Sequence, residues 1–328
     1  MNNLKLIIGR DGTFYDYSNL MEKVVWTGRK GAAPRTVTVT FADSEGYGLD
    51  RVSVNVADGQ KIQMFESGNE LFRGLVMTET KGSSRKLTIK AYDILVYMTN
   101  NKSSFSYKKK RADQIFSDCC KQLGLTIGGM DNTEKILSEV AKSACTYWDI
   151  IQEALSQTYK ATGHRFYVYS EKGLVYLRRR KAPEAILELT GSTNTISYER
   201  TRSIYETRTR VKMVTSKNKT KQLWKNEGLE KKIGVFQEVQ NVDKDITKTE
   251  LKQRVDTFAA EKAVVNGSMT WEGLGDSSIK AGAVVSIAND HLSLYRQAYV
   301  DEDTHTWQKG SHTMKLKLIF AANIDAAG

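Results

Sequence analysis

The chain has 328 residues, 40% hydrophobic and 27% charged, which is long enough for two or three domains and ordinary for a globular protein. Its formal net charge of +11 is compatible with an acidic partner, a nucleic acid or solvated basic loops. No run of about 18 apolar residues is present, so we expect no membrane-spanning helix. The apolar run near the start is too short for a signal peptide, and we expect synthesis and retention in the cytoplasm.

The cysteines do not suggest a disulfide framework. There are three of them, an odd number. Cys119 and Cys120 are adjacent on an expected helix, which is poor geometry for a disulfide, and Cys145 stands alone. We interpret all three as reduced structural thiols.

Alternating strand patterns open and close the chain. Valines and a phenylalanine alternate with threonines over residues 36–41, and Met, Leu and Phe alternate with Thr, Lys and Ile over residues 313–320. Such alternation places one face of a strand on a core and the other toward solvent or a partner. Before residue 105, further strands are expected over 4–8, 24–26, 52–56, 71–76 and 85–92, with a loop over 27–34. Their spacing favours a barrel or sandwich.

Helical spacing replaces this pattern over residues 106–183. One helix is expected from Ala112 to Leu123, closed by Gly124, and a second follows Thr146 as its N-cap. Two strands, over 165–170 and 174–179, are expected to follow around a turn at 171–173. We interpret this segment as a small, separable α+β insert.

Residues 184–328 return to strands around one helix. The helix is expected from Lys248 to Val265, with Gly267 as its stop. Strands are expected over 206–214, 233–239, 268–271, 283–287 and 297–301, and the last hairpin turns at 308–310. The predicted fold class is therefore α+β and mainly β. It consists of two barrel-like β domains, residues 1–105 and 184–328, around the α+β insert at 106–183.

The sequence lacks the common motifs of catalysis and cofactor binding. It contains no glycine-rich phosphate loop, no Gly-x-Ser-x-Gly elbow, no Cys-x-x-Cys and no histidine pair at zinc-helix spacing. We therefore assign no catalytic, cofactor-binding or metal-binding residue, and no cofactor.

Three weaker candidates compete with structural roles. Cys145 precedes a helix, where backbone N–H groups favour a thiolate, and with His164 it would suit a cysteine peptidase. His305 and His312 flank a hairpin turn and would form either a two-ligand metal site or a pair of strand-surface histidines. The carboxylates at 301–303 fit a glycosidase pair as well as a polar strand end.

Basic residues gather in three places. The clusters are residues 108–111, residues 178–181, and Lys217, Lys219, Lys221 and Lys225. They suit a nucleic-acid or acidic-partner surface, or solvated loops and strand ends. No recognition-helix motif accompanies them, which favours solvated loops.

Three separated blocks resemble one family. They are VVWTGRKGAAPRTVTVTF at 24–41, the segment from ELFRGL to IGGM at 70–130, and QAYVDEDTHTWQKGSHTMKLKLIF at 297–320. Together they resemble PBSX-type prophage tail proteins, which are similar to the baseplate hub of contractile phage tails, the late control protein D group. The third block includes Asp303, Thr304, His305, Thr306 and Trp307.

The resemblance implies a non-enzymatic, trimeric hub in a virion or tail-like particle, assembled in the bacterial cytoplasm. Its implied partners are the hexameric tail tube, the trimeric central spike and other baseplate proteins, without a membrane or sequence-specific nucleic acid. Phage, prophage and bacteriocin origins stay open. A phage-tail-associated peptidoglycan hydrolase is the alternative, and the charge of +11 motivates a nucleic-acid binder as a third class. The two β bodies and the missing catalytic motifs favour the hub.

Overall fold

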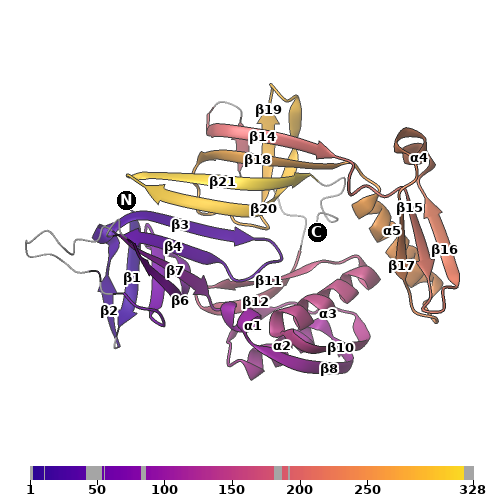
Figure 1. Ribbon diagram of the computed structural model, residues 1–328, viewed down its shortest axis with the longest axis horizontal. Helices are drawn as coiled ribbons and strands as arrows, with labels where there is room; N and C mark the ends of the chain where they lie inside the picture. The colour runs from indigo at the N-terminus through magenta and orange to yellow at the C-terminus, as the bar shows by residue number, and fades with distance from the viewer. Residues whose placement is uncertain are drawn as a thin grey trace, which may run out of the picture.

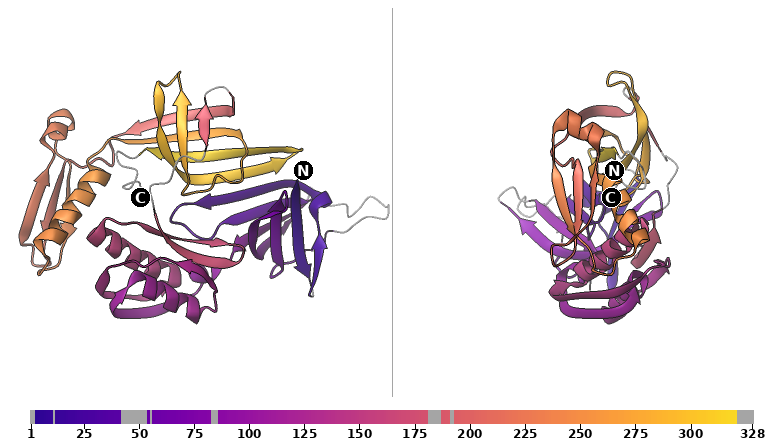
Figure 2. Two further views of the ribbon diagram at one scale, coloured as in Figure 1. Left: turned by 180° about the vertical axis from the view of Figure 1, so that it is seen from behind. Right: turned by 90° about the vertical axis from the view of Figure 1, so that its right-hand side faces the viewer.

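A computed structural model describes residues 3–10, 12–41, 54, 56–82, 86–180, 187–190 and 193–320. The fold is mainly β, as predicted, with helices in the middle of the chain and near its last third (Figure 1). Two β bodies, the α+β insert and a small fourth module are visible in Figure 1 and from behind in Figure 2.

The N-terminal body consists of antiparallel strands in the order β3-β4-β7-β6-β5-β1-β2. Its elements are β1 (Leu4–Arg10), β2 (Thr13–Asp16), a 3-10 turn η1 (Ser18–Leu20), β3 (Met21–Arg29), β4 (Thr36–Phe41), β5 (Lys61–Glu66), β6 (Asn69–Lys81) and β7 (Leu87–Asp93). The predicted alternation is confirmed in β4, because Val37, Val39 and Phe41 are buried and the threonines between them are partly exposed. These side chains pack with Leu6 and Ile8 of β1 into one hydrophobic cluster.

The insert has its own hydrophobic cluster, and that cluster begins at Leu95. Its elements are α1 (Val96–Asn100), β8 (Lys102–Arg111), α2 (Ala112–Gln122), β9 (Ile127–Met130), β10 (Ile136–Thr146), α3 (Tyr147–Thr162), β11 (Phe166–Glu171) and β12 (Leu174–Arg179). Thr146 caps α3 through a reciprocal capping box with Asp149, as predicted. Gly163 closes the same helix in a left-handed conformation.

The C-terminal body holds the third hydrophobic cluster. Its strands are β13 (Glu188–Thr190), β14 (Thr195–Ser203), β18 (Asn266–Leu274), β19 (Val284–Asn289), β20 (Leu294–Gln308) and β21 (Ser311–Phe320). The predicted alternation is confirmed in β21, where Met314, Leu316 and Leu318 are buried. Lys309 and Gly310 form the predicted last turn, both with positive φ.

A separate small module lies between β14 and β18 in the sequence. Its elements are β15 (Arg210–Val214), β16 (Thr220–Lys225), α4 (Glu227–Ile233), β17 (Gln237–Asn241) and α5 (Lys248–Lys262). They form a sheet in the order β16-β15-β17 with a hydrophobic cluster of its own. The sequence pattern placed this segment inside the C-terminal body, and Figure 1 shows it projecting at one end of the molecule.

The two β bodies share one continuous sheet. The pairing of β20 with β3 links the order β14-β18-β21-β20 to the N-terminal strands, and β19 and β13 branch from β20. Within the described ranges the strand pairing does not close either body into a barrel. The boundaries at residues 105 and 183 stay a prediction.

Several local expectations were wrong. The expected loop over 27–34 begins later, because β3 continues to Arg29 in pairing with β20. Gly267 does not stop the third helix, which ends at Lys262, but lies in β18. Val54 and Val56 are buried without forming a strand, and Val52 lies outside the described residues.

Two elements of the insert were missed for one reason. The pair β8 and β10 was not predicted because most of its side chains are polar and exposed. Only Phe105 and Tyr107 of β8 are buried, so the alternation that signals a strand is weak.

We predict that residues 94–180 fold alone. All buried members of their cluster lie within this range. The described ion pairs that tie the insert to other parts of the chain are Lys135–Glu250, Arg165–Glu261 and Lys280–Glu171, which are partly exposed and contribute little to stability. The isolated fragment should show a cooperative thermal transition by circular dichroism. Replacing the fully buried Ile151 by Asp should abolish it. A wild-type fragment that melts without a transition would contradict the prediction.

Candidate functional site: the seam between the two β bodies

The seam is the antiparallel pairing of β3 with β20. The register runs from Glu302 opposite Arg29 to Gln308 opposite Lys23. The block Asp303 to Trp307, quoted above for the family resemblance, therefore lies on the strand that joins the two bodies. Residues 301–303 lie at the centre of β20, so the alternative that placed them at a polar strand end was wrong.

A buried ion pair crosses the seam. Arg35, just before β4, donates hydrogen bonds from Nη1 and Nη2 of its guanidinium to the two carboxylate oxygens of Asp303 on β20. The Nη1–Oδ1 distance is 2.9 Å. The Asp303 side chain is fully buried and also accepts the backbone N–H of Ala281 at 2.6 Å. The guanidinium lies 4.3 Å from the ring of Trp26. Bidentate Arg–carboxylate geometry of this kind fixes direction as well as distance.

Gly28 makes room for this ion pair. It faces Asp303 across the seam, and a Cβ at this position would collide with the guanidinium of Arg35. The collision is with the charged head itself, which is held by Asp303 and cannot move aside cheaply. Any other residue at position 28 would therefore push the pair apart.

Four rings stack along the seam beside the ion pair. Trp26 lies 5.3 Å from His305 and 6.4 Å from Trp307, measured between ring centroids. His312 of β21 stacks on Trp307 at 4.1 Å. The indole N–H of Trp307 donates to Glu66 of β5 at 2.8 Å, which is a second polar tie between the bodies.

The expected closeness of His305 and His312 is confirmed. Their Nδ1 and Nε2 atoms are 3.1 Å apart. His305 Nε2 lies 2.8 Å from the carbonyl oxygen of Ile279, so Nε2 carries the proton and Nδ1 accepts from His312. Burial lowers the pKa of His305, and burial together with the His305 ring lowers the pKa of His312 to about 4. Both rings are neutral at pH 7.

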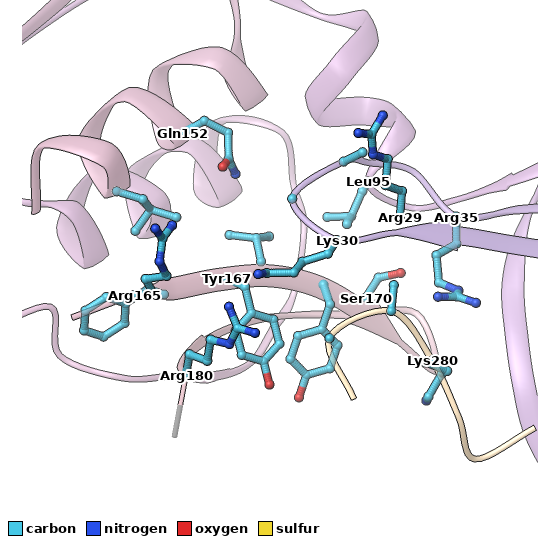
Figure 3. Close-up of a pocket in the computed structure, with 18 of the residues that line it drawn as sticks. Arg29, Lys30, Arg35, Leu95, Gln152, Arg165, Tyr167, Ser170, Arg180 and Lys280 are labelled. Carbon is cyan, nitrogen blue, oxygen red and sulfur yellow. The ribbon is translucent and has the colours of Figure 1, made fainter. Parts of the chain in front are cut away.

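A cavity of about 590 Å³ lies next to the seam, where both β bodies meet the insert (Figure 3). It is lined by the loop after β3, by α3, by β11 and by residues 278–283. In Figure 3 the charged ends of Lys30, Arg165 and Arg180 lie in one part of the cavity, near Tyr167. Tyr299 faces two of these cations, with Lys30 5.4 Å and Arg180 3.4 Å from its ring centroid.

Burial shifts two titratable groups of the cavity wall in opposite directions. Burial, and then the charges of Arg180 and Arg165, lower the pKa of Lys30 to about 7. Burial raises the pKa of Asp93 to about 6, although this carboxylate accepts backbone N–H groups from Arg35 and Leu95. Desolvation opposes the charged form in both cases.

Ion pairs tie residues of the cavity wall to other parts of the chain. Arg165 of the insert pairs with Glu261 of α5 in the small module, and its guanidinium stacks on Tyr159 at 3.7 Å. Lys280 of the C-terminal body reaches Glu171 of β11. Arg165 and Lys280, which line the cavity, therefore each pair with a carboxylate from another part of the chain.

The structure does not support the cysteine-peptidase candidates. Cys145 is buried in the insert core, and burial raises the pKa of its thiol, the reverse of what the cysteine-peptidase candidate requires. Its Sγ lies 3.9 Å from the carbonyl oxygen of Lys142. His164 instead lies 3.2 Å from Glu134.

The carboxylates at 301–303, the candidates for a glycosidase pair, lie beside cations. Asp301 and Glu302 lie 3.9 Å and 3.3 Å from Arg29, and Glu302 also reaches Lys317. Asp303 belongs to the seam. Sequence reasoning missed Arg35, whose partner is 268 positions away.

Basic residues of two clusters have local partners. Arg111 pairs with Asp113 at 2.9 Å, and Lys110 lies 5.5 Å from the ring of Tyr107. Arg178 pairs with Asp131 at 2.9 Å and Arg179 with Glu134 at 3.1 Å. Arg180 lines the cavity, and residue 181 lies outside the described residues.

The described ranges hold neither a metal-type cluster nor a membrane-spanning helix. They contain no group of three or more His, Cys, Asp or Glu side chains arranged to hold a metal ion. None of their helices is long and apolar enough to span a bilayer.

The family model described as YQBQ-like matches residues 24–319, which include the seam, the insert, the small module and all of the β-body strands except β1, β2 and the ends of β3 and β21. The chain belongs to this family. It is 32% identical over 302 residues to phage-like element PBSX protein XkdQ of Bacillus subtilis (strain 168), covering 91% of this chain and 92% of the relative. This agrees with the resemblance drawn from the three sequence blocks.

Solved structures share the fold at low sequence identity. A tail protein from Neisseria meningitidis MC58 is 10% identical with a TM-score of 0.75, covering 99% of this chain and 98% of that one. The E. coli c3393 protein is 8% identical with a TM-score of 0.57, covering 93% and 74%. It is described as a type VI secretion component with structural similarity to the T4 tail proteins gp27 and gp5. The chain is thus a YQBQ-like protein related to a protein of the phage-like element PBSX, and it shares its fold with phage tail proteins of known structure.

We predict that replacing Arg35 by Met destabilises the chain by about 3–5 kcal/mol, because it leaves Asp303 buried and unpaired. Replacing Asp303 by Asn in the same chain should recover part of the loss, since the amide needs no counter-charge. Urea unfolding of the wild type, the single variant and the double variant measures both steps. Equal stability of the two variants would show that the buried charge is not the cause.

A second prediction concerns pH. The His312 pKa is lowered to about 4 in the folded chain against 6.5 when unfolded, so the folded state binds fewer protons between these values. The contribution of the neutral His312 ring to the unfolding free energy is fully present above pH 6.5. As the pH falls toward 4, the unfolding free energy decreases by up to about 3 kcal/mol. The unfolding free energy of a His312→Gln variant should fall less over this window.

Asp93 serves as the internal reference for this comparison. Its raised pKa acts with the opposite sign, stabilising the fold as the pH falls from about 6. It is present in both chains, so the difference between wild type and His312→Gln isolates the pair of His312 and its hydrogen-bonded partner His305. Parallel pH profiles for the two chains would contradict the prediction.

Proposed function

We propose that the chain is the baseplate hub of a contractile phage tail or phage-tail-like bacteriocin, adapting the hexameric tail tube to the trimeric central spike. The observation that carries the proposal is the seam, which fuses two β bodies of one chain into a continuous sheet. Two findings on other proteins support the proposal. The relative is named as a PBSX protein, and the E. coli protein is described as similar to T4 tail proteins.

The symmetry argument follows from the paired bodies. A threefold spike below a hexameric tube leaves half of the tube's contacts unmatched unless an adaptor intervenes. Three chains with two β bodies each present six units in a ring while keeping threefold symmetry. The Arg35–Asp303 pair and the stacked rings would keep the two bodies of each chain at a fixed angle, which such a ring requires.

The hub acts by assembly rather than catalysis in this proposal, as a component of the virion or tail-like particle. Its partners are two further copies of the chain, the tube protein, the spike protein and other baseplate proteins. The peptidoglycan-hydrolase alternative depends on Cys145 or on a carboxylate pair. A buried thiol of raised pKa and carboxylates in ion pairs give it no support. A zymogram on the purified chain tests that alternative directly.

We predict three copies of the chain per particle end, with the two β bodies alternating around the ring. Quantitative mass spectrometry of purified particles against the tube protein gives the copy number, and cryo-electron microscopy gives the arrangement. The isolated chain serves as control, since a monomer in solution is compatible with ring closure on the tube or spike. Six copies at the particle end, or β bodies that do not alternate, would refute the proposal.

A further inference from the structure

The small module presents an uncovered sheet face. Its sheet is covered on one side by α5, because Val211 and Met213 of β15 pack with Val255 and Phe258 of that helix. In Figures 1 and 2 the helix lies between the sheet and the rest of the chain, so the other side of the sheet faces away from the molecule. No described helix or strand covers that side.

The outward face carries apolar side chains at its centre. Lys212 of β15 lies opposite Leu223 of β16 on one side and Val239 of β17 on the other, so the three share one row. Alternation along β15 places Lys212 on the side opposite Val211 and Met213. Leu223 is 52% exposed and Val239 is 55% exposed. These two side chains of the row leave apolar surface in contact with water, which is unfavourable. A partner that buried them would remove this free-energy cost.

The charge of this face is positive. Two of its cations have partners, since Arg210 pairs with Glu230 at 2.8 Å and Lys225 pairs with Glu227 at 2.7 Å. The remaining lysines form no ion pair with any residue that the structure describes. They are Lys212 in the row, Lys221 on β16, and Lys217 and Lys219 at the turn before it. On β17 the residues that alternate with the buried side are Gln237, Val239 and Asn241, none of them acidic.

This combination selects among possible occupants. A second copy of the same face would place its lysines against like charges, which costs free energy. A nucleic acid would leave Leu223 and Val239 against phosphates with nothing to bury them. A segment that carries both carboxylates and apolar side chains satisfies the lysines and buries the row.

We propose that the outward face of β16-β15-β17 docks an acidic, apolar-bearing segment of a neighbouring tail protein. This inference rests on the proposed function, because it places the neighbour in the assembled particle. The seam positions the β bodies in the ring, and the small module, tied to the insert by Arg165 and Glu261, would reach outward to a different subunit.

The first experiment measures protection of the face. Cys119, Cys120 and Cys145 are all buried, so the native chain gives a low background with a maleimide reagent. A Leu223→Cys chain should react rapidly when isolated and at least tenfold more slowly in purified particles. The matched control is Lys252→Cys on α5, the far side of the module, where the side chain is 78% exposed. This control should react equally in both states.

The second experiment reports the chemistry of the partner. A carbodiimide joins an amine directly to a carboxylate, so treated particles should contain Lys212 or Lys221 linked to an Asp or Glu of another protein, read by mass spectrometry. Charge reversal by Lys212→Glu with Lys221→Glu should lower incorporation into particles at least tenfold. The circular dichroism of the isolated chain should be unchanged, since both lysines are partly or fully exposed.

The outcomes separate the two proposals. If the chain is present in particles with the predicted copy number but the thiol of the Leu223→Cys variant still reacts fully, the docking inference is wrong and the hub stands. Cross-links only to another copy of this chain, or Leu223-dependent sedimentation with phosphatidylglycerol vesicles in place of a protein cross-link, also overturn it. A chain that is absent from purified particles overturns both proposals.

Discussion

The arrangement of the chain depends on one buried ion pair. Asp303 is fully buried in the middle of β20, and without Arg35 its charge would have no counter-charge in a low-dielectric interior. Arg35 comes from the edge of the other β body, so the pair is satisfied only when β3 and β20 are in register. A slip of one residue would turn Asp303 to the opposite face of the sheet. The ion pair therefore fixes the register between the two bodies. Gly28 has no side chain, which leaves the space that the guanidinium of Arg35 occupies.

Other polar contacts surround the Arg35–Asp303 ion pair. Trp307 reaches Glu66, the two histidines form a hydrogen bond across β20 and β21, and the cavity beside them gathers cations from three parts of the chain. The lysine and the aspartate of the cavity wall have pKa values of about 7 and about 6, because burial disfavours charge at both. Such groups add little to stability but penalise alternative packings, since each misplaced body would leave a buried polar group without its partner.

The sequence predicted regular elements better than the joints between them. The alternation in β4 and β21 and the cap of α3 are local signals, and all three are confirmed. Strands over 206–214 and 233–239 and the helix from Lys248 were expected, but β16 and the separation of these elements into a module of their own were missed. The sequence of β16 exposes lysines and isolated apolar residues, which look like loop composition. Arg35 escaped because nothing near it in sequence marks its partner, while the block from Asp303 to Trp307 was noted only as a family pattern. Contacts between residues this far apart are set by the tertiary fold rather than by local periodicity.

The antiparallel seam also sets how the joint carries mechanical load. A pull directed along β20 strains all the hydrogen bonds between Glu302 and Gln308 together, because they lie side by side across the pulling direction. A pull at right angles lifts one end of β20 from β3 and breaks the hydrogen bonds one after another. The joint between the two bodies is therefore strong in shear along its strands and weak in peeling, and any force that a tail transmits through this chain meets a direction-dependent resistance.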